Sequence, residues 1–172
     1  MIQRLEAKHR SRDLELRASV LNSPEVEQAV HNADIICSAT SSTEPLFSSD
    51  WVKSGTHLNL IGSYKPTMRE IETDLVRRAH KLVVDSAEVC LIEAGELIKA
   101  GLKEDDLAEL GTICGGGAEH RKACEELRQV TGGKDVTIFK SVGVGAQDVM
   151  IAAAVLRKAE ERGIGTVIEG YD

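Results

Sequence analysis

Aromatic residues, prolines and long apolar runs are all scarce in this sequence of 172 residues. Aromatic residues make up 3 % of the chain, which is too few for a surface that stacks nucleic-acid bases. The net charge of −7 has the wrong sign for binding phosphate backbones, so we expect no nucleic-acid partner. No apolar run approaches the ~20 residues of a membrane span, and residues 1–8 hold no apolar signal-peptide core. We therefore expect a cytoplasmic protein with no membrane partner.

Cysteine is also sparse, and the spacing of the four cysteines argues against disulfide bonds and structural metal sites. The four cysteines include no Cys-x-x-Cys pair, which disfavours both a disulfide framework and a zinc knuckle. The nearest approach to a ligand cluster is Cys114, His120 and Cys124, which offers three ligands at irregular spacing beside a run of three glycines. We predict no metal site.

What the sequence does contain is an alternation of short apolar runs and longer amphipathic stretches. Hydrophobic residues make up 42 % and charged residues 28 %, as in a globular domain with its own core. The alternation predicts an α/β fold with a parallel sheet. We expect strands at 14–16, 34–39 (buried), 58–61, 81–85 and 136–139. We expect helices at 2–10, from Pro24 behind a Ser23 cap, after Thr67 or Thr73, across about 86–110 with breaks at Gly95 and Gly101, at 119–129 and at 145–162.

Small hydroxyl residues and glycines follow several of these predicted strands, at 38–41, 61–64, 85–86 and 140–143. In an open parallel sheet, ligands bind beyond the carboxyl ends of the strands. Two interpretations stay open, because the same residue types also serve ordinary turns. The Gly-x-Gly-x-x-Gly loop that would indicate a dinucleotide site is absent from the sequence.

Several segments, in order over essentially the whole chain, resemble the ornithine cyclodeaminase/mu-crystallin family. They are residues 33–40, 43–45, 58–66, 69–70, 84–86 and 137–143, together with Asp148. The resemblance implies a partial Rossmann-type parallel sheet flanked by helices. Residues 1–137 would form an NAD(P)-binding domain that lacks its first strand and Gly-rich loop. Residues 138–172 would form a C-terminal segment that returns to a missing dimerisation and substrate domain.

The same resemblance implies the positions of a binding site. Cofactor contacts are expected at Thr40, at Ile61, Gly62 and Ser63, and at Ser141 and Val142. Cyclodeaminases carry a catalytic aspartate in a Gly-Gly-Asp-x-Pro motif, and this chain has Tyr64 there, followed by Lys65. A phenol with a pKa near ~10 does not replace a carboxylate as a general base near neutral pH, so ornithine cyclodeamination is disfavoured. Tyr64 and Lys65 are instead candidate proton donors.

Three hypotheses about function follow. In the first, the intact form is an NAD(P)-dependent oxidoreductase, a homodimer acting on a cyclic imine or an amino or imino acid. In the second, it is a non-catalytic binder of the mu-crystallin type that holds a nucleotide or a small aromatic acid. In the third, the chain is an inactive truncated fragment, with strand 33–39 as an unpaired edge and the last helix without packing partners. We expect the chain on its own to bind NAD or NADP weakly or not at all.

Overall fold

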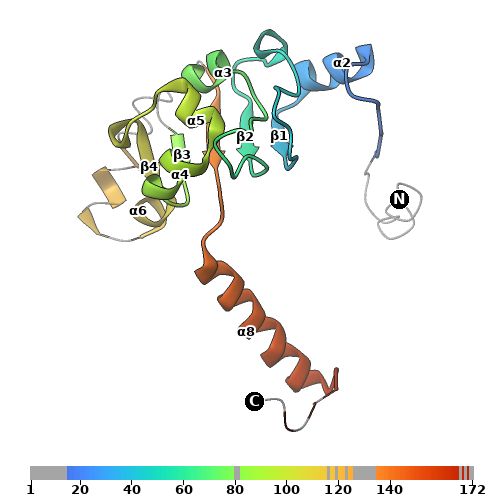
Figure 1. Cartoon of the computed structure of the whole chain (residues 1–172), viewed down its shortest axis with the longest axis vertical. Coiled ribbons are helices and arrows are strands. Elements are labelled where there is room, and N and C mark those ends of the chain that lie inside the picture. The colour runs from blue at the N-terminus through green and yellow to red at the C-terminus, as the bar shows by residue number, and fades with distance from the viewer. Residues whose placement is uncertain are drawn as a thin grey trace.

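The computed structural model describes residues 15–79, 82–115, 117–118, 120–122, 124–125, 135–166, 168 and 170 (Figure 1). Within these ranges, five strands form one sheet in the order β1-β2-β5-β3-β4. They are β1 (Ile35–Ser38), β2 (His57–Leu60), β3 (Leu82–Val84), β4 (Leu107–Glu109) and β5 (Thr137–Lys140), and every pairing is parallel. The predicted α/β fold with a Rossmann-type parallel sheet is confirmed.

The helices begin and end largely where the sequence predicts. They are α2 (Pro24–Asn32), α3 (Thr73–Arg78), α4 (Ala87–Glu93), α5 (Gly95–Ala100), α6 (Leu110–Cys114) and α8 (Gly145–Arg162), with 3₁₀ turns η1 (Ser49–Trp51) and η2 (Glu104–Asp106). Gly95 and Gly101 bound α5 as expected. Gly101 follows the helix with φ of +70°, a left-handed conformation that glycine adopts without strain.

One face of the sheet holds the hydrophobic core. Alternate residues on each strand point to this face, because side chains along a strand alternate between the two sides of a sheet. The helices α3, α4 and α5 contribute their own buried residues to the same cluster. Its most deeply buried members are Leu58, Leu60, Ile71, Leu75, Val76, Leu82, Val84, Cys90, Ala94, Leu97 and Ile138. The core therefore fixes three helices against the strands whose ends form the candidate site.

The strand predicted at 34–39 exists as β1, but the prediction that it is buried is wrong. Ile35 is 64 % exposed, and of the four residues in β1 only Ser38 is buried. The reason is its place in the sheet: among the described residues, no strand pairs with the outer side of β1. The expectation that this strand forms an edge is confirmed.

Two other predictions about strands need correction. Glu15 and Leu16 lie in an irregular segment rather than a strand, because no described strand offers them a partner. The region predicted as helical across 86–110 ends at Ala100, and residues 107–109 form β4, which pairs with β3. The helix predicted at 2–10 lies outside the described residues. Of the helix predicted at 119–129, the described residues 120–122 and 124–125 are helical.

The last helix stands apart from the sheet, as Figure 1 shows for α8. The structure describes all of α8, and none of its residues is buried. Its exposed apolar side chains include Val149, Met150, Ile151, Val155 and Leu156. The domain boundary expected at 137/138 falls inside β5, which pairs with both β2 and β3, so the sheet continues to Lys140. Within the described ranges, no helix combines the length and hydrophobicity that crossing a membrane requires.

Candidate functional site

The parallel strands end at one edge of the sheet, and the residues that follow β1, β2, β5 and β3 lie next to one another there. Backbone hydrogen bonds continue past the strands: Ile61 N–H donates to Ser38 O at 2.9 Å, and Ser141 N–H donates to Leu60 O at 3.0 Å. We call this the carboxyl edge; it comprises residues 38–42, 60–65, 85–86 and 140–143. All of the predicted site residues belong to it.

A buried carboxylate joins the ends of β1 and β2. Glu70 is fully buried and accepts three hydrogen bonds. The Ser38 hydroxyl donates to it at 2.9 Å, the Gly62 N–H at 2.8 Å and the Thr40 N–H at 2.5 Å. Because buried polar groups need partners, these donors satisfy the carboxylate and the carboxylate satisfies them. Glu70 thereby sets the spacing between the two strand ends that carry the expected cofactor contacts.

Gly62 lies where these two strand ends approach most closely. A Cβ atom at this position would lie 1.9 Å from the Thr40 carbonyl oxygen and 2.5 Å from Glu70 Oε1. Neither neighbour can move aside for an added Cβ, because one is backbone and the other is a buried, hydrogen-bonded carboxylate. Only glycine fits at this point of the carboxyl edge.

The loop that carries Tyr64 and Lys65 is fastened at its base. The Ser63 hydroxyl is fully buried; it donates to Met68 O at 2.8 Å and accepts from Gly95 N–H at 3.2 Å. Tyr64, by contrast, is 47 % exposed, and Lys65 is also exposed. Lys65 Nζ lies 5.4 Å from the centre of the Tyr64 ring, within the range of a cation–π contact. The hydrogen bonds of Ser63 therefore hold the start of a loop on which the Tyr64 phenol and the Lys65 ammonium group lie side by side in solvent.

A second carboxylate organises the chain after β5. Asp85 Oδ2 accepts from the Ser141 hydroxyl at 2.7 Å, from Gly143 N–H at 2.8 Å and from Val142 N–H at 3.1 Å. Burial by itself raises the pKa of Asp85. The hydrogen bonds, that from Ser141 foremost, outweigh this and hold the pKa below its usual value. Asp85 is therefore a carboxylate at neutral pH, and it fixes the turn at Gly143, where φ is +88°.

The thiol of Cys90 lies against the other oxygen of Asp85, at 3.3 Å. Burial raises the pKa of this thiol to about 12, and the neighbouring carboxylate adds to the shift. Cys90 is therefore a protonated donor and not a nucleophile.

A buried ion pair lies beneath the same edge. Lys140, the last residue of β5, and Glu96 of α5 are both fully buried, with Nζ and Oε1 separated by 3.3 Å. Burying the two charges costs desolvation free energy, and their mutual attraction offsets this cost only while the two side chains stay close together. It links the strand that leads to Ser141 with the helix whose Gly95 holds the Tyr64 loop.

The family model of the ornithine cyclodeaminase/mu-crystallin family matches residues 3–163. The chain belongs to this family. Its fold and its carboxyl edge can therefore be compared with those of known family members.

Two curated relatives show which chemistry occurs in the family. A Δ1-pyrroline-2-carboxylate reductase of Bacillus cereus is 38 % identical over 147 residues, which cover 83 % of this chain and 42 % of the relative. The ketimine reductase mu-crystallin of Mus musculus is 37 % identical over 130 residues, covering 76 % of this chain and 37 % of the relative. The chain thus spans about two fifths of the length of the curated relatives it matches.

A solved structure agrees with the fold. The Δ1-pyrroline-2-carboxylate reductase of Thermococcus litoralis, in complex with NADH and L-proline, superposes with a TM-score of 0.64 at 31 % identity. The match covers 83 % of this chain and 42 % of that structure.

In the structure of the present chain, all the predicted site residues lie at one edge of the sheet, and they differ in how far they are exposed. Thr40 and Ile61 are exposed, and Ser141 and Val142 are half-buried. Gly62 and Ser63 are buried, and the Ser63 hydroxyl already makes hydrogen bonds to Met68 and Gly95. Their roles as cofactor contacts stay predictions.

Sequence reasoning missed the acidic residues that hold this edge. Nothing in the sequence distinguishes Glu70 from a surface carboxylate, although it lies in a segment that resembles the family. Asp85 had a usable signal, because it directly follows a buried strand. Lys140 had one too: the two-residue period of β5 places it on the same face as the buried Ile138.

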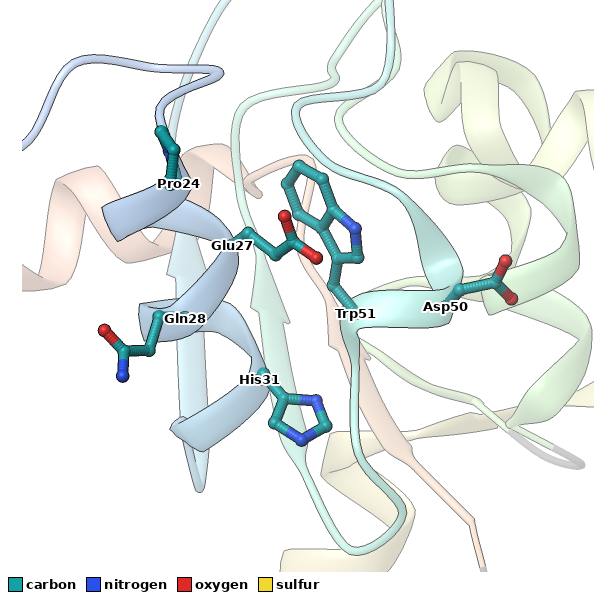
Figure 2. A pocket seen from close by; sticks show the side chains of 6 residues that line it. All are labelled: Pro24, Glu27, Gln28, His31, Asp50 and Trp51. Carbon is teal, nitrogen blue, oxygen red and sulfur yellow. The ribbon is translucent and has the colours of Figure 1, made fainter.

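Of the grooves that the described residues form away from the candidate cofactor contacts, two have the following linings. One, of about 600 Å³, lies between α2 and η1 and is lined by Pro24, Glu27, Gln28, His31, Asp50 and Trp51. Figure 2 shows the Glu27 carboxylate directed towards the Trp51 indole and the Asp50 side chain directed away. The other, of about 330 Å³, borders the loop after Lys65 and is lined by Thr43, Glu44, residues 66–69, Gly95, Ile98 and Lys99.

Proposed function

We propose that this chain forms the nicotinamide side of an NAD(P)-binding domain in an oxidoreductase that acts on a cyclic imine or a related amino or imino acid. The observation that carries the proposal is the construction of the carboxyl edge. Glu70 joins the ends of β1 and β2 and Asp85 joins the ends of β3 and β5, at the edge where open α/β sheets bind nucleotides. The family relationship and the reductases among the relatives support the same reaction class.

The groups exposed along this edge fit the nicotinamide nucleoside half of the cofactor. Thr40 and Ser141 offer neutral hydroxyls, and Ile61 offers an apolar side chain that is 45 % exposed. A flat aromatic ring, its carboxamide and a ribose need hydroxyl partners and an apolar surface. Thr40, Ile61, Ser141 and Val142 would hold this half. The bound cofactor would supply the hydride.

Tyr64 and Lys65 would supply the proton. Reducing a C=N bond requires a proton at nitrogen as well as a hydride at carbon. Both side chains stand on the loop anchored by Ser63, exposed to an incoming substrate. The ammonium of Lys65 beside the Tyr64 ring favours an anionic substrate such as a carboxylate-bearing imine. We assign these two residues to proton donation and to attraction of the substrate carboxylate.

The larger organisation follows from the same proposal. Residues after Lys140 would return to a dimerisation and substrate domain of a homodimeric cytoplasmic enzyme. The absence of any buried residue in α8 supports this, because a helix with so many exposed apolar side chains is typical of one that packs on another surface.

The proposal is tested by transplanting this chain into a relative that supplies the remainder of the fold. The chain would replace the matching segment of the Bacillus cereus reductase, and NADH oxidation would be measured with Δ1-pyrroline-2-carboxylate. We expect turnover, and a loss of roughly a hundredfold in kcat when Tyr64→Phe and Lys65→Met are combined. The exposed Ser54→Ala is the matched control and should leave turnover unchanged.

One observation favours a second function. Tyr64 stands where cyclodeaminases carry a catalytic aspartate, and its ring offers an aromatic surface to a ligand. A non-catalytic protein of the mu-crystallin type that holds a nucleotide or a small aromatic acid would use the same edge. A folded chimera that binds NADH but does not oxidise it with any cyclic imine would favour this function and contradict the first.

A further inference from the structure

Asp85 has no acceptor capacity left for a ligand. Oδ2 accepts from the Ser141 hydroxyl and from the N–H groups of Val142 and Gly143, while Oδ1 accepts from Cys90 Sγ and from Ser86 N–H at 2.9 Å. A carboxylate offers about four lone-pair positions, and five donors already surround this one. Asp85 therefore acts on a ligand only through the groups that it holds.

The group that it holds at the carboxyl edge is the Ser141 hydroxyl. A hydroxyl has one proton to donate and two lone pairs. Its proton goes to Asp85 at 2.7 Å, because a carboxylate accepts and does not donate. One lone pair faces Gly143 N–H at 3.3 Å, and one remains. Ser141 is half-buried, so the residue is partly open to solvent, and the remaining lone pair is the position that a ligand donor would use.

We propose that Asp85 is a positioning residue that makes Ser141 a hydrogen-bond acceptor only, so that the carboxyl edge selects ligands presenting an N–H group at Ser141. This inference rests on the proposed function and deepens it. Without the carboxylate, Ser141 would donate to or accept from a ligand with equal ease. With Asp85 in place, a ligand acceptor at the same position would face a lone pair and be rejected.

Two N–H donors suit the proposed reaction. One is the amino group of the nicotinamide carboxamide, and the other is the ring N–H of a cyclic amino or imino acid. The chemistry at Ser141 is the same for both, and analogues that lack the donor distinguish them. Reduced 3-acetylpyridine adenine dinucleotide replaces the carboxamide amino group with methyl. Tetrahydrofuran-2-carboxylate replaces the ring N–H of L-proline with oxygen.

The test measures dissociation constants of these four compounds with the full 172-residue chain, from backbone-amide shifts in NMR titrations that tolerate weak binding. We expect one analogue to bind roughly three- to tenfold more weakly than its parent, as for the loss of one hydrogen bond. A preference for NADH assigns the donor to the cofactor, and a preference for L-proline assigns it to the substrate. Ser141→Ala should abolish that preference and Ser141→Thr, which keeps the hydroxyl, should retain it.

Asp85→Ala separates the positioning role from general support of the fold. Without the carboxylate the Ser141 proton loses its acceptor and is free to donate to a ligand, which should remove the preference. Ser54→Ala, at an exposed loop position, should change nothing. If Asp85→Ala binds every compound more weakly by the same factor, the role of Asp85 is structural and the inference is wrong.

A measurement without ligand tests the inference even if a variant binds none of the compounds. The carboxyl pKa of Asp85, followed by NMR, should rise in Ser141→Ala, because the hydroxyl donates to the charged form. An unchanged pKa would overturn the inference. Equal binding of both compounds in each pair by the unaltered chain would overturn it too and leave the proposed function standing. No binding of any of the four would match the expectation that the chain on its own binds NAD or NADP weakly or not at all, and the pKa of Asp85 in Ser141→Ala would then decide the inference alone.

Discussion

Glu70 and Asp85 are the carboxylates that hold the carboxyl edge together: Glu70 accepts hydrogen bonds from residues at the ends of β1 and β2, and Asp85, at the end of β3, accepts them from the residues after β5. Glu70 joins β1 to β2, and Asp85 joins β3 to the turn after β5. At the residue scale, the order of the candidate site therefore depends on acceptors whose hydrogen bonds are made within the protein.

Removing the Glu70 carboxylate should destabilise the fold strongly. In Glu70→Ala the Ser38 hydroxyl and the Gly62 N–H lose their acceptor in a buried environment, and we expect a loss of about 3 kcal/mol in the free energy of unfolding. Urea denaturation measures this. Glu44→Ala is the matched control, because Glu44 is 74 % exposed and its ion pair with Arg69 should contribute under ~1 kcal/mol. Similar losses in both variants would contradict the role given to Glu70.

Gly62→Ala tests the close approach of β1 and β2. The added Cβ meets the Thr40 carbonyl at 1.9 Å, so we expect a loss of roughly 3 kcal/mol or a failure to fold. Gly111→Ala is the control, because open space surrounds that glycine within α6 and alanine favours a helix. A Gly62→Ala variant with an unchanged urea midpoint would show that the strand ends are less closely packed than described.

The lowered pKa of Asp85 predicts a pH dependence of stability. The unfolded chain takes up a proton near the ordinary aspartate pKa of about 3.9, before the folded chain does. The stabilisation from Asp85 is therefore present above about pH 5 and is lost as the pH falls through the unfolded and then the folded pKa. The stability difference between the unaltered chain and Asp85→Asn should be larger at neutral pH than near pH 3. An equal difference at both pH values would contradict this assignment.

At the scale of elements, patterning predicted most of the helices and strands. Proline behind a serine marks the start of α2, Gly101 marks the end of α5, and the stripe of apolar residues predicts α8 at its observed bounds. The strand β4 was missed because Leu107, Ala108 and Glu109 lack both β-branched residues and alternation. Its existence depends on pairing with β3, which no local pattern encodes.

The isolation of α8 has a measurable consequence. An isolated helix of this length is marginal in water, and α8 buries none of its residues. Amide hydrogen exchange should therefore show protection factors in α8 at least roughly a hundredfold below those in β2 and β5. Equal protection would mean that another surface, such as a second copy of the chain, covers α8 in solution.

At the scale of the whole molecule, the sequence predicted the class of sheet and that the candidate site residues share one edge, but not the order of the strands. The last strand, β5, lies between β2 and β3, which places Ser141 between Ile61 and Asp85. This order arises from packing between distant segments. The same holds for the pairing of Lys140 with Glu96, because only the tertiary structure brings β5 and α5 together.

The central claim is that the carboxyl edge of this sheet binds a nicotinamide nucleotide. The most direct test is a map of backbone-amide shifts in the full chain as NADH is added. We predict that the amides of Thr40, Ile61 and Val142 shift together, while those of Gly55 and Val136, at the opposite ends of β2 and β5, stay in place. Shifts confined to the groove between α2 and η1 would contradict the claim.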